Sequence, residues 1–186
     1  MPNWCNNSIT IKGDYDTLVQ LKPVVEAGEG LLQAICPMPA ELEGTTAPSD
    51  EPNWYDWCNA NWGTKWDPEV HLEFIDNEDG TATIQGWFET AWAPPIDAFN
   101  TLAEDWDSCY IELMYEEPGM CFVGCWDSEG ADDHYEYDGA TSDTVRNMIP
   151  EYLVDQFALD ERLSEYEQEE AECEDEEEFD AVPTGL

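Results

Sequence analysis

Short runs of alternating hydrophobic and polar residues recur along the chain, which is the pattern of strands with one buried face. The first, in residues 3–11, ends in SITIKG and places Ile9 and Ile11 on one side. Two more, VHLEFID and TATIQGWFE, flank the dipeptide Asp79–Gly80, which is typical of tight hairpin turns. CYIELMYEE and MCFVGCWD follow later in the chain. The pattern therefore predicts five strands, of which the second and third form a hairpin.

Apolar residues at helical spacing predict two helices between these strands. In DYDTLVQLKPVVEAGEG, Leu18, Leu21 and Val25 share one face and Gly28 ends the segment. In IDAFNTLAEDW the equivalent face carries Ile96, Phe99, Leu102 and Ala103. Strand, helix, strand, strand, helix, strand is the order of the split β-α-β, or ferredoxin-like, arrangement. We therefore expect an α+β fold in which two helices cover one face of an antiparallel sheet, with a Trp-rich helix inserted before the second strand.

The last third of the chain is more polar. A polar acidic loop, DSEGADDHYEYDG, follows the fifth strand, and TSDTVRNMI and EYLVDQFALDERLSEY then predict two helices, the second opened by Pro150. The residues that follow have almost nothing to bury and repel one another. The sequence thus predicts a ferredoxin-like domain over 1–140, C-terminal helices packed on or beside it over 141–166, and a largely disordered acidic tail over 167–186.

Charge is the extreme property of this chain. Asp and Glu number 45 against five Lys and Arg, which gives a formal net charge of −40. Such a surface repels nucleic acid and anionic membranes, and it attracts basic proteins at rates that fall with salt. No apolar run approaches the roughly 20 residues of a membrane span, and the first residues lack the features of a secretion signal. Irregularly spaced cysteines are typical of reduced thiols. We expect a cytoplasmic protein that binds neither nucleic acid nor membrane directly.

The segment WYDWCNANWGTKWD is exceptionally rich in aromatic residues, with one lysine among Trp54, Trp57, Trp62 and Trp66. Together with Trp87 and Trp92, these indoles are candidates for a platform that stacks on bases or a cation. The alternative is that they cover one end of a small core, with Lys65 paired to Asp56 or Asp67. We favour packing, because the surrounding negative charge would repel a phosphate chain.

Catalytic and cofactor motifs are not recognisable. The two histidines, His71 and His134, lie in no nucleophile–base context, and no glycine-rich phosphate loop is present. Cys121 and Cys125 with His134 supply a weak zinc pattern, because a second cysteine pair is missing. The acids of the polar loop would gather a divalent cation only loosely. We therefore expect no enzymatic activity, no cofactor and no specific metal site.

Four blocks in order, MPNWCNN, WYDWCNANWGTKWD, GWFETAWAPP and YEEPGMCFVG, resemble those of the YubB ferredoxin-like family, whose members occur on phages and conjugative plasmids. They cover residues 1 to about 127. The resemblance implies a ferredoxin-like fold and a bacterial host, and it implies no catalytic residues. The family pattern usually has a basic residue where Cys58 stands here, which puts an ion pair at that position in doubt.

The charge leads to a specific hypothesis about function. Residues 1–159 hold 32 acids and four bases, a net charge of −28. A body of that size is roughly 40 Å across, and duplex DNA of that length carries about 24 phosphate charges. We therefore predict an acidic DNA mimic that binds and inhibits a basic nucleic-acid-binding protein of the bacterial host, such as a defence factor or a DNA-binding regulator. This would be a counter-defence protein of a phage or plasmid.

The acids expected to bind this partner lie where the chain is most polar. They are Glu129, Asp132, Asp133, Glu136 and Asp138 in the loop, and Asp155, Asp160, Glu161, Glu165 and Glu169 on the last helix. On that helix, an acid every four residues gives a row with about 6 Å between neighbours. Two alternatives remain: an acidic surface that serves only solubility, and a protein-binding or self-associating module, such as a homodimer, that uses its Trp-rich edge.

Overall fold

The structure, a computed structural model, describes the backbone of residues 3–180 and the side chains of residues 3–172. The chain forms two compact units, which divide between His134 and Tyr135. This division lies close to the domain end at residue 140 that the sequence predicts. It falls inside a strand that the sequence does not predict.

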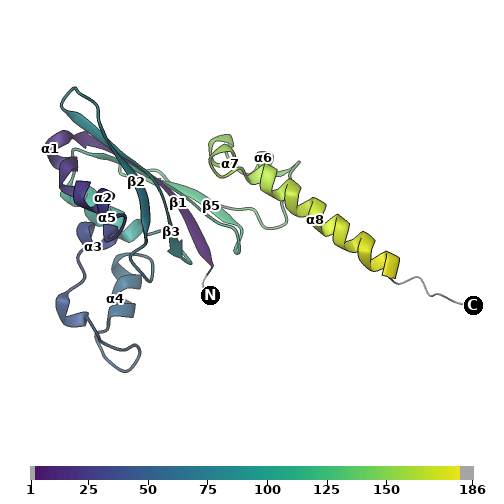
Figure 1. Cartoon of the computed structure of the whole chain (residues 1–186), viewed down its shortest axis with the longest axis horizontal. Coiled ribbons are helices and arrows are strands. Elements are labelled where there is room, and N and C mark those ends of the chain that lie inside the picture. The colour runs from purple at the N-terminus through teal and green to yellow at the C-terminus, as the bar shows by residue number, and fades with distance from the viewer. Residues whose placement is uncertain (1–2, 181–186) are drawn as a thin grey trace, which may run out of the picture. The chain divides into compact units, whose positions relative to one another are not determined.

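The first unit is built on a six-stranded sheet with the strand order β2-β3-β1-β4-β5-β6 (Figure 1). The strands are β1 (Trp4–Asp14), β2 (Val70–Asp76), β3 (Thr81–Ala91), β4 (Tyr110–Glu117), β5 (Phe122–Asp127) and β6 (Asp132–Glu136). β1 pairs antiparallel with β3 on one side and with β4 on the other, and β2 forms the expected hairpin with β3. The first four strands therefore have the ferredoxin-like order, and the predicted α+β fold is confirmed.

Strand β6 corrects the prediction of a loop after the fifth strand. Asp132, Asp133 and Glu136 lie on this edge strand, and all three side chains are exposed. A strand exposed on both faces carries no alternation of apolar and polar residues, so its sequence looks like a loop. Acidic side chains on an edge strand also discourage pairing with a further strand.

Short helices connect the strands of the first unit. The predicted first helix is divided into α1 (Tyr15–Leu18), the 3-10 turn Val19–Leu21 and α2 (Lys22–Ala27), because Pro23 suits only the first turn of a helix. Gly28 and Gly30 both have a left-handed backbone conformation, and they separate α2 from α3 (Leu31–Ile35), a helix that we did not predict. The others are the 3-10 turn Ala40–Leu42, the Trp-rich α4 (Trp54–Asn61) and α5 (Ile96–Asp105).

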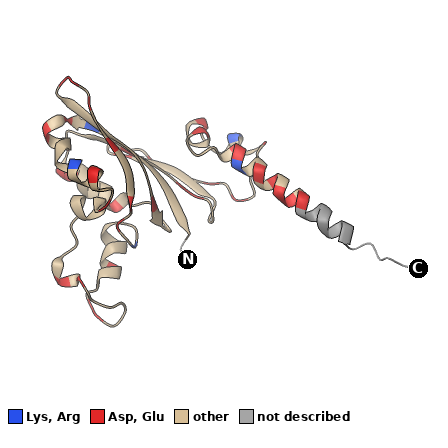
Figure 2. Cartoon of the chain, in the orientation of Figure 1, with Lys and Arg blue, Asp and Glu red and all other residues tan. Residues whose placement is uncertain are grey.

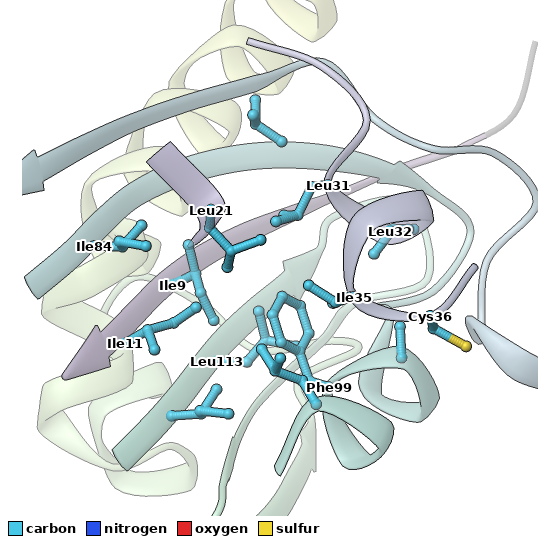
Figure 3. Close-up of a cluster of buried hydrophobic side chains, with 14 of the residues drawn as sticks. Ile9, Ile11, Leu21, Leu31, Leu32, Ile35, Cys36, Ile84, Phe99 and Leu113 are labelled. Carbon is cyan, nitrogen blue, oxygen red and sulfur yellow. The ribbon is translucent and has the colours of Figure 1, made fainter. Parts of the chain in front are cut away.

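The hydrophobic core lies between the sheet and these helices. Figure 3 shows Ile9 and Ile11 of β1 and Leu113 of β4 beneath side chains from α3 and from α5, whose Phe99 is fully buried. Burial of a Leu, Ile or Phe side chain contributes about 1.5–3 kcal/mol, so this layer is the main source of stability. Because side chains alternate along a strand, every second residue of β1, β2 and β3 points away from this core.

The second unit consists of α6 (Val145–Met148), α7 (Glu151–Phe157) and α8 (Leu159–Asp180). Its buried apolar residues are Tyr137, Val145, Ile149, Leu153, Val154 and Leu159. The predicted last helix is interrupted at Ala158, which has a left-handed backbone and separates α7 from α8. Helix α8 runs beyond residue 166, where we expected the helical segment to end. The part of the expected tail from 181 to 186 lies outside the described residues. No described helix has both the length and the apolar composition that a membrane crossing requires.

Candidate functional site: the acidic surfaces of the two units

The ten acids predicted to bind a partner are divided between the two units. Glu129, Asp132 and Asp133 belong to the first unit, and the other seven belong to the second. Nine of the ten residues are exposed, and Asp160 is half-buried. We therefore consider the acids of each unit as a separate surface.

The turn between β5 and β6 organises the acids of the first unit. The Asp127 carboxylate accepts hydrogen bonds from the backbone N–H groups of Glu129 and Ala131, at 2.8 and 2.9 Å. This fixes the turn and leaves the Glu129 side chain in solvent. Asp132 and Asp133 are consecutive residues of β6, so their side chains point to opposite faces of the sheet. These two acids therefore do not form one row.

Arg146 of α6 organises part of the second acidic surface. Its Nε and Nη2 donate to one carboxylate oxygen of Asp160, at 2.9 and 2.8 Å, and its Nη1 lies 2.9 Å from a carboxylate oxygen of Asp155. These hydrogen bonds raise the pKa of Arg146 and hold the pKa of Asp160 below its ordinary value. Asp155 and Asp160 are therefore partly neutralised within the chain, which makes them weaker candidates for partner binding than the sequence suggests.

Helix α8 carries the densest run of acids. Of its 22 residues, 13 are Asp or Glu and only Arg162 is basic. Glu161, Glu165 and Glu169 are all exposed and follow one another at four-residue intervals, about 6 Å apart along the axis. Figure 2 shows acids recurring along the described part of α8, whereas those of the first unit are scattered among other residues.

A further acid of α8 holds the helix to the preceding segment. Glu167 accepts from the backbone N–H of Ser142 through one carboxylate oxygen and from the Ser142 hydroxyl through the other, both at 2.8 Å. This double contact keeps α8 against the segment before α6. The exposed row of three glutamates therefore has a defined position within the second unit.

The Trp-rich segment is only partly a packing element. Trp62 is buried and donates from its indole N–H to the Cys36 carbonyl at 2.8 Å, and Trp54 and Trp57 pack against the core. The packing interpretation is confirmed for these three indoles. The packing interpretation is wrong for three other indoles, which stay 42–53% exposed: Trp66, Trp87 and Trp92.

Lys65 also differs from expectation. Its ammonium lies 4.2 Å from the ring centroid of Trp66 and 5.5 Å from that of Tyr55. The two carboxylates expected to pair with it have other contacts. Asp67 accepts from the backbone N–H groups at the start of α3, and Asp56 accepts from the side chain of the Asn53 cap. The Lys65 ammonium therefore lies over the rings of two aromatic residues, Tyr55 and Trp66.

The match to a family model supports the ferredoxin-like fold. Residues 61–145 match the family model described as the ferredoxin-like domain in Api92-like protein. The chain is also similar to the crystal structure of a protein Api92 from Yersinia pseudotuberculosis, with 19% sequence identity over 57% of this chain and a TM-score of 0.37. The aligned region spans 39% of the length of that protein. No curated protein matches this chain.

The family model that matches part of this chain is described as Api92-like, and the resemblance to the YubB family with its phage or plasmid setting stays a prediction. The match runs from the end of α4 to α6 and includes Glu129, Asp132, Asp133, Glu136 and Asp138. The acids of α7 and α8 lie outside it. A role for the α8 row must therefore rest on the chemistry of that helix.

Proposed function

We propose that this protein acts by binding, as an acidic mimic of nucleic acid that occupies the groove of a basic nucleic-acid-binding protein and inhibits it. The observation that carries this proposal is the exposed row of Glu161, Glu165 and Glu169 on a helix with 13 acids and one base. A long helix with carboxylates on its surface offers regularly spaced acceptors to Lys and Arg side chains. Its field also attracts a basic partner from a distance.

Contacts within the second unit reduce the number of acids that are available to bind a partner. Asp155 and Asp160 share their charge with Arg146, and Glu167 is held by Ser142. The α8 row has no such role in the contacts described above, and we assign partner binding chiefly to it. Glu129, Asp132 and Asp133 of the first unit would add to the field of the molecule, because charges attract a partner without touching it.

The setting that we propose follows from the sequence resemblance. A family found on phages and conjugative plasmids favours a bacterial host, a cytoplasmic location and a target such as a defence factor or a DNA-binding regulator. The competing proposal is that the acids serve only solubility. That proposal predicts that the position of a charge on the surface has no effect, whereas mimicry predicts a strong effect of position.

The experiment compares two triple variants of equal charge. Glu161→Lys, Glu165→Lys and Glu169→Lys together reverse the α8 row. Glu26→Lys, Glu41→Lys and Glu104→Lys reverse three exposed acids of the first unit and change the net charge by the same amount.

Full-length protein is immobilised and incubated with bacterial lysate over a salt series. We expect the wild type and the first-unit variant to retain basic proteins that a DNA duplex displaces, and the α8 variant to lose them. Equal retention by all three proteins, or capture of proteins that DNA does not displace, would refute mimicry.

A further inference from the structure

The face of the sheet that points away from the core carries aromatic residues near one end. Trp4 of β1, Trp87 of β3 and His71 of β2 alternate with the buried residues Cys5, Phe88 and Val70. Trp87 is directly opposite His71 in the pairing of β2 with β3. Their rings stack with 4.2 Å between centroids and an interplanar angle of 29°. The sheet therefore presents an aromatic surface, formed by Trp4, His71 and Trp87, to solvent.

This surface borders a pocket of about 270 Å³, lined by residues that include Trp4, Trp66, Trp87, His71, Glu69 and Glu89. The indoles of Trp4, Trp66 and Trp87 are 45%, 42% and 53% exposed. A contiguous group of large exposed apolar side chains commonly marks a binding site. Small-molecule sites commonly measure about 300–1,000 Å³, so this pocket has room for little more than one side chain.

The charge around the pocket is negative. Glu69 and Glu89 are exposed carboxylates at its rim, whereas Asp67, which also lines it, is engaged by two backbone N–H groups of α3. None of the described residues that line it is a Lys or Arg. Lys65 lies over Trp66 but lines a different hollow, beside Tyr55 and Asp56. That contact is an example, within this chain, of a cation on the same indole.

We propose that this pocket binds an arginine side chain of a partner protein. Indole faces attract cations, and a planar guanidinium stacks on them while its N–H groups reach carboxylates in a fork geometry. A lysine ammonium is a point charge that cannot stack as a plane, and a quaternary ammonium has no N–H to donate to Glu69 or Glu89. The combination of flat rings and rim carboxylates therefore selects arginine.

The site lies in the first unit and requires none of the acids of α8. It shares with the proposed function only the expectation that the partner is basic. Failure of one proposal therefore leaves the other standing, provided that the test reports on the pocket itself.

The test uses ¹⁵N-labelled full-length protein and three probes at equal ionic strength. The probes are a capped Gly/Ser peptide with one arginine, the same peptide with lysine, and tetramethylammonium chloride. We expect the arginine peptide to shift the indole N–H resonances of Trp4, Trp66 and Trp87 and to leave that of Trp92 in place. Equal shifts with all three probes, or shifts of Trp92 alone, would overturn the proposal.

Variants then place the binding. Trp87→Leu should weaken binding of the arginine peptide about twofold to thirtyfold, the range that a cation–π contact supplies. Trp92→Leu removes an equally exposed indole that is not among the lining residues, and it should have no effect.

Glu89→Gln should weaken binding severalfold with the fold intact, whereas Glu104→Gln on α5 should not. Retained affinity in both Trp87→Leu and Glu89→Gln contradicts the assignment. Loss of affinity in the triple α8 variant would also contradict it, since the peptide would then be bound by that helix.

Discussion

A methyl group at Gly124 would test the position of strand β6, which carries Asp132, Asp133 and Glu136. Gly124 of β5 is buried directly opposite Tyr115 of β4. The Tyr115 hydroxyl occupies the space that a side chain at Gly124 would fill, and it lies 3.2 Å from Nδ1 of His134. A Cβ at this position would come within 2.3 Å of the Tyr115 hydroxyl and 2.4 Å of the Asp133 carbonyl oxygen. Even a methyl side chain would therefore displace the Tyr115 ring or the backbone of β6.

The expected cost of Gly124→Ala follows from these contacts. Overpacking of a well-packed site costs about 1–3 kcal/mol, and loss of the Tyr115–His134 hydrogen bond adds about 0.5–1.5 kcal/mol. We therefore expect the free energy of unfolding to fall by about 1.5–4.5 kcal/mol. Because one of the two contacts is with the backbone of β6, the amide hydrogens of that strand should also exchange faster.

Urea denaturation and hydrogen exchange on the full chain measure both effects. Tyr115→Phe is the matched comparison, because it removes the hydrogen bond without adding a methyl group, and it should cost only about 0.5–1.5 kcal/mol. A Gly124→Ala protein as stable as the wild type, with unchanged exchange in β6, would show that β6 does not lie against β5 as described.

Two further predictions concern pH. Burial, with the charges of neighbouring glutamates, raises the pKa of Cys5 well above its ordinary value of 9.0. The buried neutral thiol therefore contributes its full stabilisation below pH 9, and this contribution is lost as the pH rises above 9. We expect the free energy of unfolding to fall above pH 9 by up to about 1.4 kcal/mol per pH unit from this thiol, and Cys5→Ala to fall less steeply in alkaline urea titrations. For Asp160 the pKa is lowered by Arg146, so the stabilisation is present above the unfolded pKa near 3.9 and is lost as the pH falls. Arg146→Met should therefore lower the melting temperature at pH 7 and leave it nearly unchanged at pH 2, and an equal decrease at both values would contradict the pairing with Asp160.

The parts of the fold that local patterns determine were predictable from the sequence. The alternation around Ile9 and Ile11 and the Asp79–Gly80 turn predicted β1 and the β2–β3 hairpin. Helix α3 was missed because its first N–H groups are capped by Asp67, which lies 35 residues away from Leu32. Such a contact leaves no local signal in the sequence.

The candidate sites were likewise predictable only where the sequence carries a local signal. Exposure of the α8 acids follows from composition, but the pairing of Arg146 with Asp160 depends on a turn between helices that only the structure supplies. The aromatic surface did have a signal. Since Phe88 fits the apolar face of β3, its neighbours Trp87 and Glu89 must point to the other face. Counting tryptophans without strand parity led us to assign Trp87 to packing.

The two proposed surfaces would contribute to binding in different ways. Exposed carboxylates on α8 act over a distance that salt screens to about 8 Å at physiological ionic strength, so they chiefly raise the rate of association. A stacked guanidinium between indoles is a short-range contact, and its loss would appear mainly as faster dissociation. If one basic partner uses both surfaces, reversal of the Glu161, Glu165 and Glu169 charges should slow association and weaken its salt dependence. Trp87→Leu should leave that dependence intact and shorten the lifetime of the complex.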